Sequence, residues 1–482
     1  MKKVLLVYPG KPGFEKKEKI PLALLFLATT LAKNNYEARI LDERIEDYRK
    51  LDYNDYLCVG ITTQTGNQIL DGIEVAKFIK KNNKELKIVW GGVHPTILPD
   101  STIDNEYVDI VVRGDGELIL LELVRAIKDN KPLKNIKGIV YKENGKVIRN
   151  SPAELVDLDK IDFPNHDLIN LKKYSYKEAF PISTSRGCSH RCSFCCVKDK
   201  WRGRSAAKII EDIEKIIKKY NPDVINVRDN NFFFSKERIR KFCEEKIKRN
   251  IKIKWKAQCR ADYFSKYDNE FVSLLKKSGC ISLLFGAESG NQRILDLLKK
   301  DIKVEDTVKS IKMCGKHGII PVLGFIIGNI TETKKEVFET LNFIDYLVKI
   351  NPETEIAGIF LLTPWPGTDT FTEFKKIGLK EPKTLEEWGH FNLGDIKHNI
   401  YVLRRHRHLY KTIEMVSRFP FFKKKKLKKS PIAKGHNRLP FFKEIGYRIL
   451  YNSAVLRWKY KFFYFGFEWD FYNFYVRRFG RF

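Results

Sequence analysis

Long hydrophobic runs are absent from this 482-residue sequence. No stretch approaches the roughly 18 uncharged apolar residues that a membrane-spanning helix requires. The first apolar run, residues 4–9, is too short to form the core of a secretory signal peptide followed by a cleavage site. We therefore predict a cytosolic protein, and its length predicts two to three domains.

Acidic residues are also scarce, with 60 Asp and Glu against 90 Lys and Arg and a net charge of +30. The last 82 residues contain 21 Lys and Arg but 4 Asp and Glu, and basic residues mix with aromatic ones at 421–429 and 457–465. Such segments suit the surface of an anionic membrane, a helical cap with a solvated basic face, or a nucleic acid. The composition favours the first two equally over the third.

The sequence also lacks a disulfide framework, because its nine cysteines are odd in number and scattered. This usage is typical of a reducing compartment. Five cysteines lie in or beside apolar segments, where we expect buried free thiols: Cys58, Cys243, Cys259, Cys280 and Cys314.

Three of the other cysteines form the motif Cys188-x-x-x-Cys192-x-x-Cys195 in a short polar loop. Three thiolates leave one iron of a four-iron four-sulfur cluster without a protein ligand, and that open position can carry chemistry. Structural zinc needs four ligands, usually as two pairs, and only one C-x-x-C pair occurs here. His190 or Cys196 could still complete a zinc knuckle, but the spacing favours an iron–sulfur cluster.

With the aromatic residue Phe194 before its last cysteine, the motif resembles the signature of the radical S-adenosylmethionine (radical SAM) superfamily. The resemblance implies that Cys188, Cys192 and Cys195 hold the cluster and that its open iron binds S-adenosylmethionine (SAM). It also implies a one-electron reductant, such as ferredoxin or flavodoxin, whose electron cleaves SAM to a 5′-deoxyadenosyl radical. Cys196 lies outside the pattern, and we expect a packed thiol there.

Residues 4–128 alternate strand-like apolar runs with helical periodicity, which predicts a doubly wound parallel sheet. Ligands bind such sheets at the carboxyl ends of the strands. Those ends carry polar or glycine-rich loops at residues 62–65, 91–96 and 113–117, although any one of them could be only a tight turn.

Together with the cysteine motif, these loops resemble the cobalamin-binding domain that precedes the radical domain in one large subfamily. The resemblance assigns the cobalamin contacts to Thr63, Gln64, Thr65, Gly91, Gly92, His94, Gly114 and Glu117. The Asp-x-His-x-x-Gly sequence that supplies an axial histidine in other cobalamin enzymes is absent after the first strand. We therefore expect no histidine ligand to cobalt from that loop, and we interpret His94 as a pocket residue.

Asn144-Gly145 predicts a hairpin, and residues 151–175 are predicted to be a linker. From residue 181 to about 362 the strand–helix alternation resumes, which indicates a partial or complete barrel with its site at the carboxyl ends of the strands. The segments 229–232, 286–290, 324–328 and 364–368 again resemble the radical SAM family. By that resemblance, SAM contacts are assigned to Phe194, Asp229, Arg260, Glu288 and Ser289. Where the family commonly has Pro-Gly-Glu-Thr, this chain has residues 329–333, Asn-Ile-Thr-Glu-Thr.

The predicted fold class is α/β: a doubly wound Rossmann-like cobalamin-binding domain (1–150), the linker (151–175), a (β/α)6 partial TIM barrel (176–390) and a small, mostly helical, basic and aromatic C-terminal region (391–482).

The predicted function is that of a radical SAM enzyme with cobalamin, which methylates an unactivated carbon; the sequence identifies no catalytic side chain. Radical cyclisation or oxidation without methyl transfer is the main alternative, and a non-catalytic cofactor-binding sensor is another. The basic tail suggests an apolar or membrane-associated small-molecule substrate, such as an isoprenoid lipid, hopanoid or porphyrin-like molecule.

Overall fold

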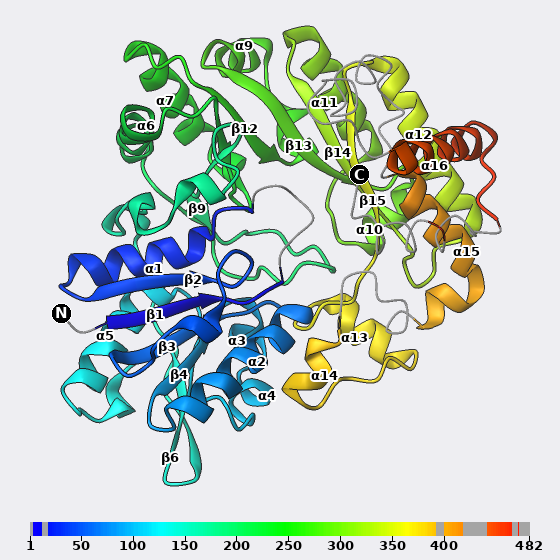
Figure 1. Cartoon of the computed structure of the whole chain (residues 1–482). Coiled ribbons are helices and arrows are strands. Elements are labelled where there is room, and N and C mark those ends of the chain that lie inside the picture. Colours follow the sequence, from blue (N-terminus) through cyan, green and yellow to red (C-terminus); the bar gives the residue numbers. More distant parts are fainter. Residues whose placement is uncertain (1–2, 12–17, 392–399, 418–440, 465–470, 472–482) are drawn as a thin grey trace.

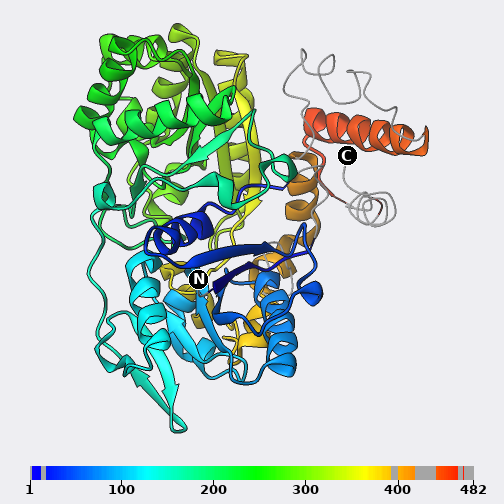
Figure 2. The same cartoon turned by 60° about the vertical axis from the view of Figure 1, so that its left-hand side comes forward.

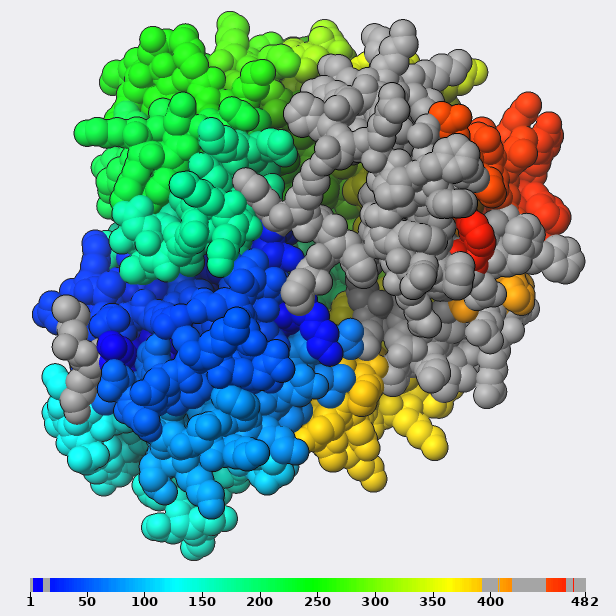
Figure 3. Space-filling model, in the orientation of Figure 1, coloured from blue at the N-terminus to red at the C-terminus, as the bar shows by residue number. Residues whose placement is uncertain are grey.

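A computed structural model describes residues 3–11, 18–391, 400–417, 441–464 and 471. Two α/β domains are stacked on each other, with the N-terminal domain below the barrel in the view of Figure 1 and after rotation in Figure 2. The space-filling view shows the two domains in broad contact (Figure 3). The predicted fold class is confirmed.

The N-terminal domain is a seven-stranded sheet of order β2-β1-β3-β4-β5-β6-β7, parallel from β2 to β5 and antiparallel beyond. Its strands are β1 (Lys3–Tyr8), β2 (Glu37–Asp42), β3 (Tyr56–Thr62), β4 (Lys87–Gly91), β5 (Ile110–Val112), β6 (Ile139–Glu143) and β7 (Lys146–Arg149). Its helices are α1 (Leu22–Lys33), α2 (Asn67–Asn82), α3 (Val93–Ile97), α4 (Pro99–Ile103) and α5 (Gly116–Lys128).

Strand β1 shows why this sheet is covered by helices on both faces. Val4 and Leu6 pack into one apolar core with helices α1 and α5, whereas Leu5 and Val7 pack into the other with α2. A continuous apolar run is typical of a parallel strand that is buried on both faces. The predicted hairpin is also present, since Asn144 and Gly145 join β6 to β7 with φ of 52° and 74°.

The second domain is a sheet of six parallel strands in the order β15-β14-β13-β12-β11-β8, curved into a partial barrel with its helices outside (Figure 1). Its strands are β8 (Phe180–Ile182), β11 (Val224–Val227), β12 (Lys254–Cys259), β13 (Cys280–Glu288), β14 (Ile320–Ile327) and β15 (Glu355–Leu361). Its longer helices are α6 (Ala206–Tyr220), α7 (Lys236–Lys248), α9 (Asn269–Lys277), α11 (Val304–His317) and α12 (Lys334–Ile350), with short helices α8 (Ala261–Phe264) and α10 (Gln292–Leu297). The five cysteines predicted to be buried free thiols are all buried and free.

The chain returns to the N-terminal domain after the last barrel strand. Helices α13 (Asp369–Lys376) and α14 (Leu385–Gly389) place Phe371, Trp388 and Phe391 in the core formed by the outer face of β1 and α2. The last residues of the predicted barrel domain therefore pack on the N-terminal domain. The predicted domain boundaries themselves stay predictions.

The described part of the C-terminal region caps the barrel edge. Helix α15 (Ile400–Ser417) packs on β15, where the Ile359 backbone N–H donates to Ser417 Oγ at 3.3 Å. In α16 (Phe441–Tyr460), Trp458 Nε1 donates to Asp345 Oδ1 of α12 at 2.7 Å. These contacts support the helical-cap interpretation.

The lysine-rich run at 423–429 lies outside the described residues. Within the described ranges, no helix combines the length and the apolar character needed to cross a membrane. Association of the tail with a membrane surface or with nucleic acid is supported by nothing in the structure and stays a prediction.

Candidate functional site

The loop that carries the three motif cysteines leaves and returns through a short antiparallel ribbon, β9 (Ser185–Arg186) and β10 (Arg202–Gly203). Gly187 has a φ of 75°, and a Cβ at this position would lie 2.4 Å from the Lys200 carbonyl oxygen. A side chain cannot be placed there. Glycine therefore allows the two ends of the loop, which form its neck at β9 and β10, to come together immediately before Cys188.

The three thiols are partly or fully buried and have hydrogen-bond donors beside them. Asn231 Nδ2 lies 3.8 Å from Cys188 Sγ, and Arg260 Nη1 lies 3.8 Å from Cys192 Sγ. Burial raises the pKa of the Cys195 thiol, and the neighbouring thiols raise it further; ligation to iron reverses this effect, because a coordinated thiol is deprotonated. Three sulfurs with two adjacent donors fit an anionic iron–sulfur cluster. Among the described residues, no set of three His, Cys, Asp or Glu side chains is arranged to hold a single metal ion.

Asp229 binds the residues that immediately precede this loop. Its carboxylate accepts hydrogen bonds from the Thr184 backbone N–H at 2.6 Å, the Thr184 hydroxyl at 2.5 Å and the Ser185 hydroxyl at 2.7 Å. Asp229 is fully buried, and both of its oxygens are engaged. The structure therefore indicates a positioning role for Asp229, and its predicted direct contact with SAM stays a prediction.

A pocket of about 360 Å³ opens at the carboxyl ends of the barrel strands. It brings together three of the predicted SAM contacts, Phe194, Arg260 and Glu288. Ser289 is buried beside it, with its hydroxyl 3.0 Å from Thr340 Oγ1. The pocket thus lies next to the cysteine loop, where SAM would have to bind to reach the cluster.

Lys300 is a residue of this pocket that sequence reasoning missed. Its Nζ donates to Glu288 Oε1 at 2.7 Å and lies 5.8 Å from the centre of the Phe194 ring, while its carbonyl oxygen accepts from Arg260 Nη2 at 2.6 Å. Glu288 has a left-handed backbone, φ 58°, and a Cβ on Gly286 would lie 2.2 Å from its carboxylate. Lys300 follows helix α10 and belongs to no strand end, so no local pattern indicates its role.

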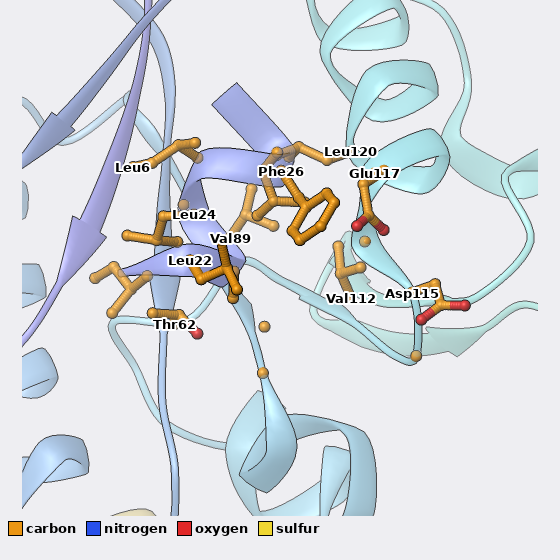
Figure 4. A pocket seen from close by; sticks show the side chains of 18 of the residues that line it. Leu6, Leu22, Leu24, Phe26, Thr62, Val89, Val112, Asp115, Glu117 and Leu120 are labelled. Atoms are coloured by element: carbon orange, nitrogen blue, oxygen red, sulfur yellow. The ribbon is translucent and has the colours of Figure 1, made fainter. Parts of the chain in front are cut away.

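A second cavity of about 360 Å³ lies between the domains, at the carboxyl ends of the N-terminal strands. Apolar side chains such as Leu22, Phe26 and Val89 form much of its wall, and Asp115 and Glu117 line it at the start of α5 (Figure 4). Gly114 has a φ of 85° and nothing within 4 Å of where a Cβ would lie. A glycine without neighbouring atoms allows a cofactor to approach the protein backbone closely, and the apolar wall beside it can pack against the cofactor.

Four of the predicted cobalamin contacts line this cavity, and the other four do not. The lining residues are Gly91, Gly92, Gly114 and Glu117, whereas Thr63, Gln64, Thr65 and His94 are not among the residues that line it. The His94 ring is fully buried, 5.7 Å from the Trp388 ring, and its Nδ1 lies 2.9 Å from the Thr65 hydroxyl. Burial lowers the pKa of His94 to about 4, so the imidazole is neutral near pH 7.

Comparison with known proteins follows the same division of the chain. The family model of the radical SAM superfamily matches residues 182–344, and the model of the B12 binding domain matches residues 16–124. An uncharacterized methyltransferase of Pyrococcus horikoshii is 32% identical over 385 residues, which cover 76% of this chain and 82% of that protein. The chain belongs to the radical SAM superfamily. Its N-terminal sheet is a B12-binding domain.

Further similar proteins include a cyclase and two radical enzymes of known structure. The anaerobic magnesium-protoporphyrin IX monomethyl ester cyclase of Rubrivivax gelatinosus is 30% identical over 309 residues, 61% of this chain and 54% of that protein. The solved structure of the cobalamin-dependent radical enzyme OxsB with aqua-cobalamin and SAM has a TM-score of 0.73 at 19% identity, covering 95% of this chain and 72% of that one. The methyltransferase TsrM of Kitasatospora setae, with cobalamin and cluster bound, has a TM-score of 0.66 at 22% identity, with 78% of each chain covered. These two structures share the fold.

Membership of the family identifies the cofactors as a four-iron four-sulfur cluster, SAM and cobalamin. The predicted iron–sulfur cofactor is therefore confirmed, and its ligation by Cys188, Cys192 and Cys195 stays a prediction. The assignment of individual side chains as contacts of SAM and cobalamin stays a prediction.

An ion network joins the B12-binding domain to the neck of the cysteine loop. Arg186 Nη1 donates to Asp115 Oδ1 at 2.8 Å, and Arg202 Nη1 donates to Asp115 Oδ2 at 2.7 Å. Arg186 also pairs with Glu117. Burial alone would raise the pKa of Asp115, but the two arginines outweigh it and hold that pKa below its usual value.

Proposed function

We propose that this radical SAM enzyme transfers a methyl group to an unactivated carbon of a small molecule. The observation that carries the proposal is that the two cofactor pockets adjoin at the end of β11. Arg228 lines the cavity of the B12-binding domain, and Asn230 and Asn231, two and three residues later, line the barrel pocket. A substrate held between them is within reach of both cofactors.

When bound, the cluster with SAM supplies a 5′-deoxyadenosyl radical that removes a hydrogen atom from carbon, and methylated cobalamin supplies the methyl group. The protein's own task is to bind, orient and exclude water. Arg260 is placed to bind the SAM carboxylate, because a guanidinium suits planar carboxylate recognition. The Lys300–Glu288 pair forms the adjacent wall of the pocket. A one-electron donor of the ferredoxin or flavodoxin class is the proposed reductant.

The reacting part of the substrate is proposed to be apolar. The apolar residues that line the barrel pocket include Leu284, Ile326, Phe360, Leu362 and Trp365. Such a wall favours burial of hydrocarbon, and it supports hydrogen abstraction from an inert C–H bond in a dry site.

Incubation of the anaerobically reconstituted enzyme with methyl-labelled SAM, a reductant and cell extract tests the proposal. We expect label in a new product together with S-adenosylhomocysteine and 5′-deoxyadenosine. Formation of 5′-deoxyadenosine with an unlabelled product would instead support radical cyclisation or oxidation, the second candidate. That alternative is favoured by the similarity to the magnesium-protoporphyrin ester cyclase.

A further inference from the structure

A polar layer lies beneath the barrel pocket, toward the amino ends of the strands. Gln258 and Leu284 line the pocket, so their side chains face the lumen. Lys256 and Ser282 come two residues earlier on β12 and β13 and therefore share that face. The strand register places Lys256 between Asn226 of β11 and Ser282 of β13. Residues Asn226, Lys256 and Ser282 thus form one layer across three strands.

Two basic side chains near this layer, Lys256 below the barrel pocket and Arg228 at the end of β11, have no counter-ion. In the ranges that the structure describes, neither the Lys256 ammonium nor the Arg228 guanidinium has a hydrogen bond or an ion pair. Lys256 is half-buried, whereas Arg228 is exposed and lines the cavity between the domains. For Lys256, a partly desolvated cation without an anion is unfavourable unless a ligand compensates it; Arg228 is a solvated cation that is free to bind an anion from that cavity.

The two basic groups that line the barrel pocket, Lys300 and Arg260, each have a carboxylate partner within the protein. Lys300 pairs with Glu288 at 2.7 Å, and Arg260 Nε pairs with Asp262 Oδ1 at 2.8 Å. The six barrel strands carry two acidic residues, Glu288 and Glu355, and Glu355 lies on the opposite edge strand, β15. No carboxylate of these strands is therefore adjacent to Lys256.

We propose that the substrate carries an anionic group, a carboxylate or a phosphate, which Lys256 and Arg228 bind, while Asn226, Ser282 and Gln258 add neutral hydrogen bonds. Lys256 is paired with Asn226 on the neighbouring strand, and Arg228 lies two residues beyond Asn226. Neighbouring strands lie about 4.8 Å apart and two residues advance about 6.6 Å, so the Cα atoms of Lys256 and Arg228 are about 8 Å apart. At that separation both long side chains can reach one anion. This inference rests on the proposed function and extends it. The substrate is amphiphilic, with an apolar reacting carbon in the upper pocket and its charged end at this layer.

The test uses the reconstituted full-length enzyme with cluster, cobalamin, SAM and reductant. A metabolite extract is separated by anion exchange at pH 7, and each fraction is assayed for transfer of methyl label. We expect activity in retained fractions alone. Activity that disappears after phosphatase treatment assigns a phosphate, and activity that survives it assigns a carboxylate. Activity confined to the unretained fraction would overturn the anion site.

Variants then connect the anion to the two cations. With the active fraction, Lys256→Met and Arg228→Met should each raise KM about tenfold or more with a smaller change in kcat, because they remove a charged hydrogen bond to bound substrate. Lys256→Arg and Arg228→Lys should restore part of the loss, and Lys252→Met, an exposed lysine nearby, should change nothing. An unchanged KM in Lys256→Met would contradict the proposal. Weakened cobalamin binding in Arg228→Met would reassign Arg228 to the phosphate of that cofactor and overturn its part.

A direct measurement separates this inference from the proposed function. If no fraction gives labelled product or 5′-deoxyadenosine, the proposed function fails, and the anion site is then judged by calorimetric titration of inorganic phosphate and acetate into the same enzyme. The wild-type protein should bind at least one of these anions, and the Arg228→Met/Lys256→Met variant should not. Equal binding by both proteins would rule the site out.

Discussion

Arg186 and Glu117 form an ion pair that joins the two cofactor domains. Arg186 lies two residues before Cys188, the first predicted cluster ligand, and Glu117 lies in the first turn of α5, beside the open loop at Gly114. A second contact of the pair, from Arg186 Nη1 to Glu117 Oε2, is 3.1 Å long, and the Glu117 side chain is 4% exposed. Because Glu117 and Gly114 also line the cavity of the B12-binding domain, one buried contact joins the loop at this cavity to the cysteine loop.

Arg186→Gln should therefore weaken both the fold and cobalamin binding. Breaking a buried ion pair by removing one partner costs about 3–5 kcal/mol, because the other charge stays buried without compensation. Thermal unfolding and equilibrium titration with hydroxocobalamin measure the two effects. Arg149→Gln, which removes an exposed pair with Asp100, is the control and should cost less than about 1 kcal/mol. If Arg186→Gln matched this control in both measurements, the pair would have no coupling role.

Replacing Cys188, Cys192 and Cys195 together by Ala should abolish the cluster. The three thiols are the predicted cluster ligands, and no replacement sulfur on the loop has the same spacing. Iron and sulfide analysis with low-temperature electron spin resonance checks the loss after anaerobic reconstitution. Cys196→Ala should retain the full signal, and a complete signal in the triple variant would show that the cluster is held elsewhere.

Reduced cobalamin bound to this enzyme should show no nitrogen superhyperfine splitting from a histidine. The axial-histidine motif is missing, and His94 lies outside the residues that line the cavity, with its ring buried against Trp388. Its Nδ1 is already engaged with the Thr65 hydroxyl. Electron spin resonance of cob(II)alamin in the wild-type protein and in His94→Phe should give the same cobalt spectrum. A splitting that disappears in the variant would identify His94 as a ligand.

The sequence predicted both sheets and the cysteine loop because these depend on local patterns. Strand and helix periodicities, strand-end glycines and a spacing of three and two residues between thiols are all visible within short windows. The Arg186–Glu117 pair joins positions 69 residues apart, and Trp388 reaches His94 from the far end of the barrel domain. Such contacts are fixed only when the domains are packed, so no window of sequence contains them.

Composition also failed to decide how the tail is used. Basic and aromatic residues at 457–464 are compatible with a membrane surface or a cap, because both bury rings and expose charge. The structure shows the Trp458 ring buried against the barrel and its Nε1 bonded to Asp345, a partner that the local sequence does not specify. Lys300 was missed for a similar reason, since its partner Glu288 precedes it by twelve residues across helix α10.

Trp458→Ala should destabilise the barrel itself. The indole packs in the barrel's apolar core, and truncation of a buried Trp costs about 3–5 kcal/mol. The measurement is the Tm of the holoenzyme, and Leu456→Ala on the exposed side of the same helix is the matched control. Equal Tm values for the two variants would mean that the tail is not an integral cap.

Glu332 should make stability fall as the pH rises from about 4.5 to about 7. Its carboxylate follows β14 and accepts from the backbone N–H groups of Gly328 at 2.5 Å and Asn329 at 3.0 Å. Burial raises its pKa to about 7 and outweighs these hydrogen bonds. Below the unfolded pKa of about 4.5, the group is protonated in both states and the stability is fully present. Between the two pKa values the unfolded chain loses the proton first, which removes stability on the order of 3 kcal/mol by pH 7.

Glu332→Gln isolates this contribution, because its carbonyl oxygen can still accept from Gly328 and Asn329 while its charge cannot change. Free energies of unfolding from denaturant titrations at pH 5, 6, 7 and 8 should decline for the wild-type protein relative to the variant up to about pH 7 and run parallel above it. Other groups that titrate in this range, Glu43 among them with a pKa raised by burial to about 6, affect both proteins and cancel in the difference. A constant difference across all four pH values would show that Glu332 ionises normally, and that the turn at 329–333 tolerates the charge through its two backbone donors.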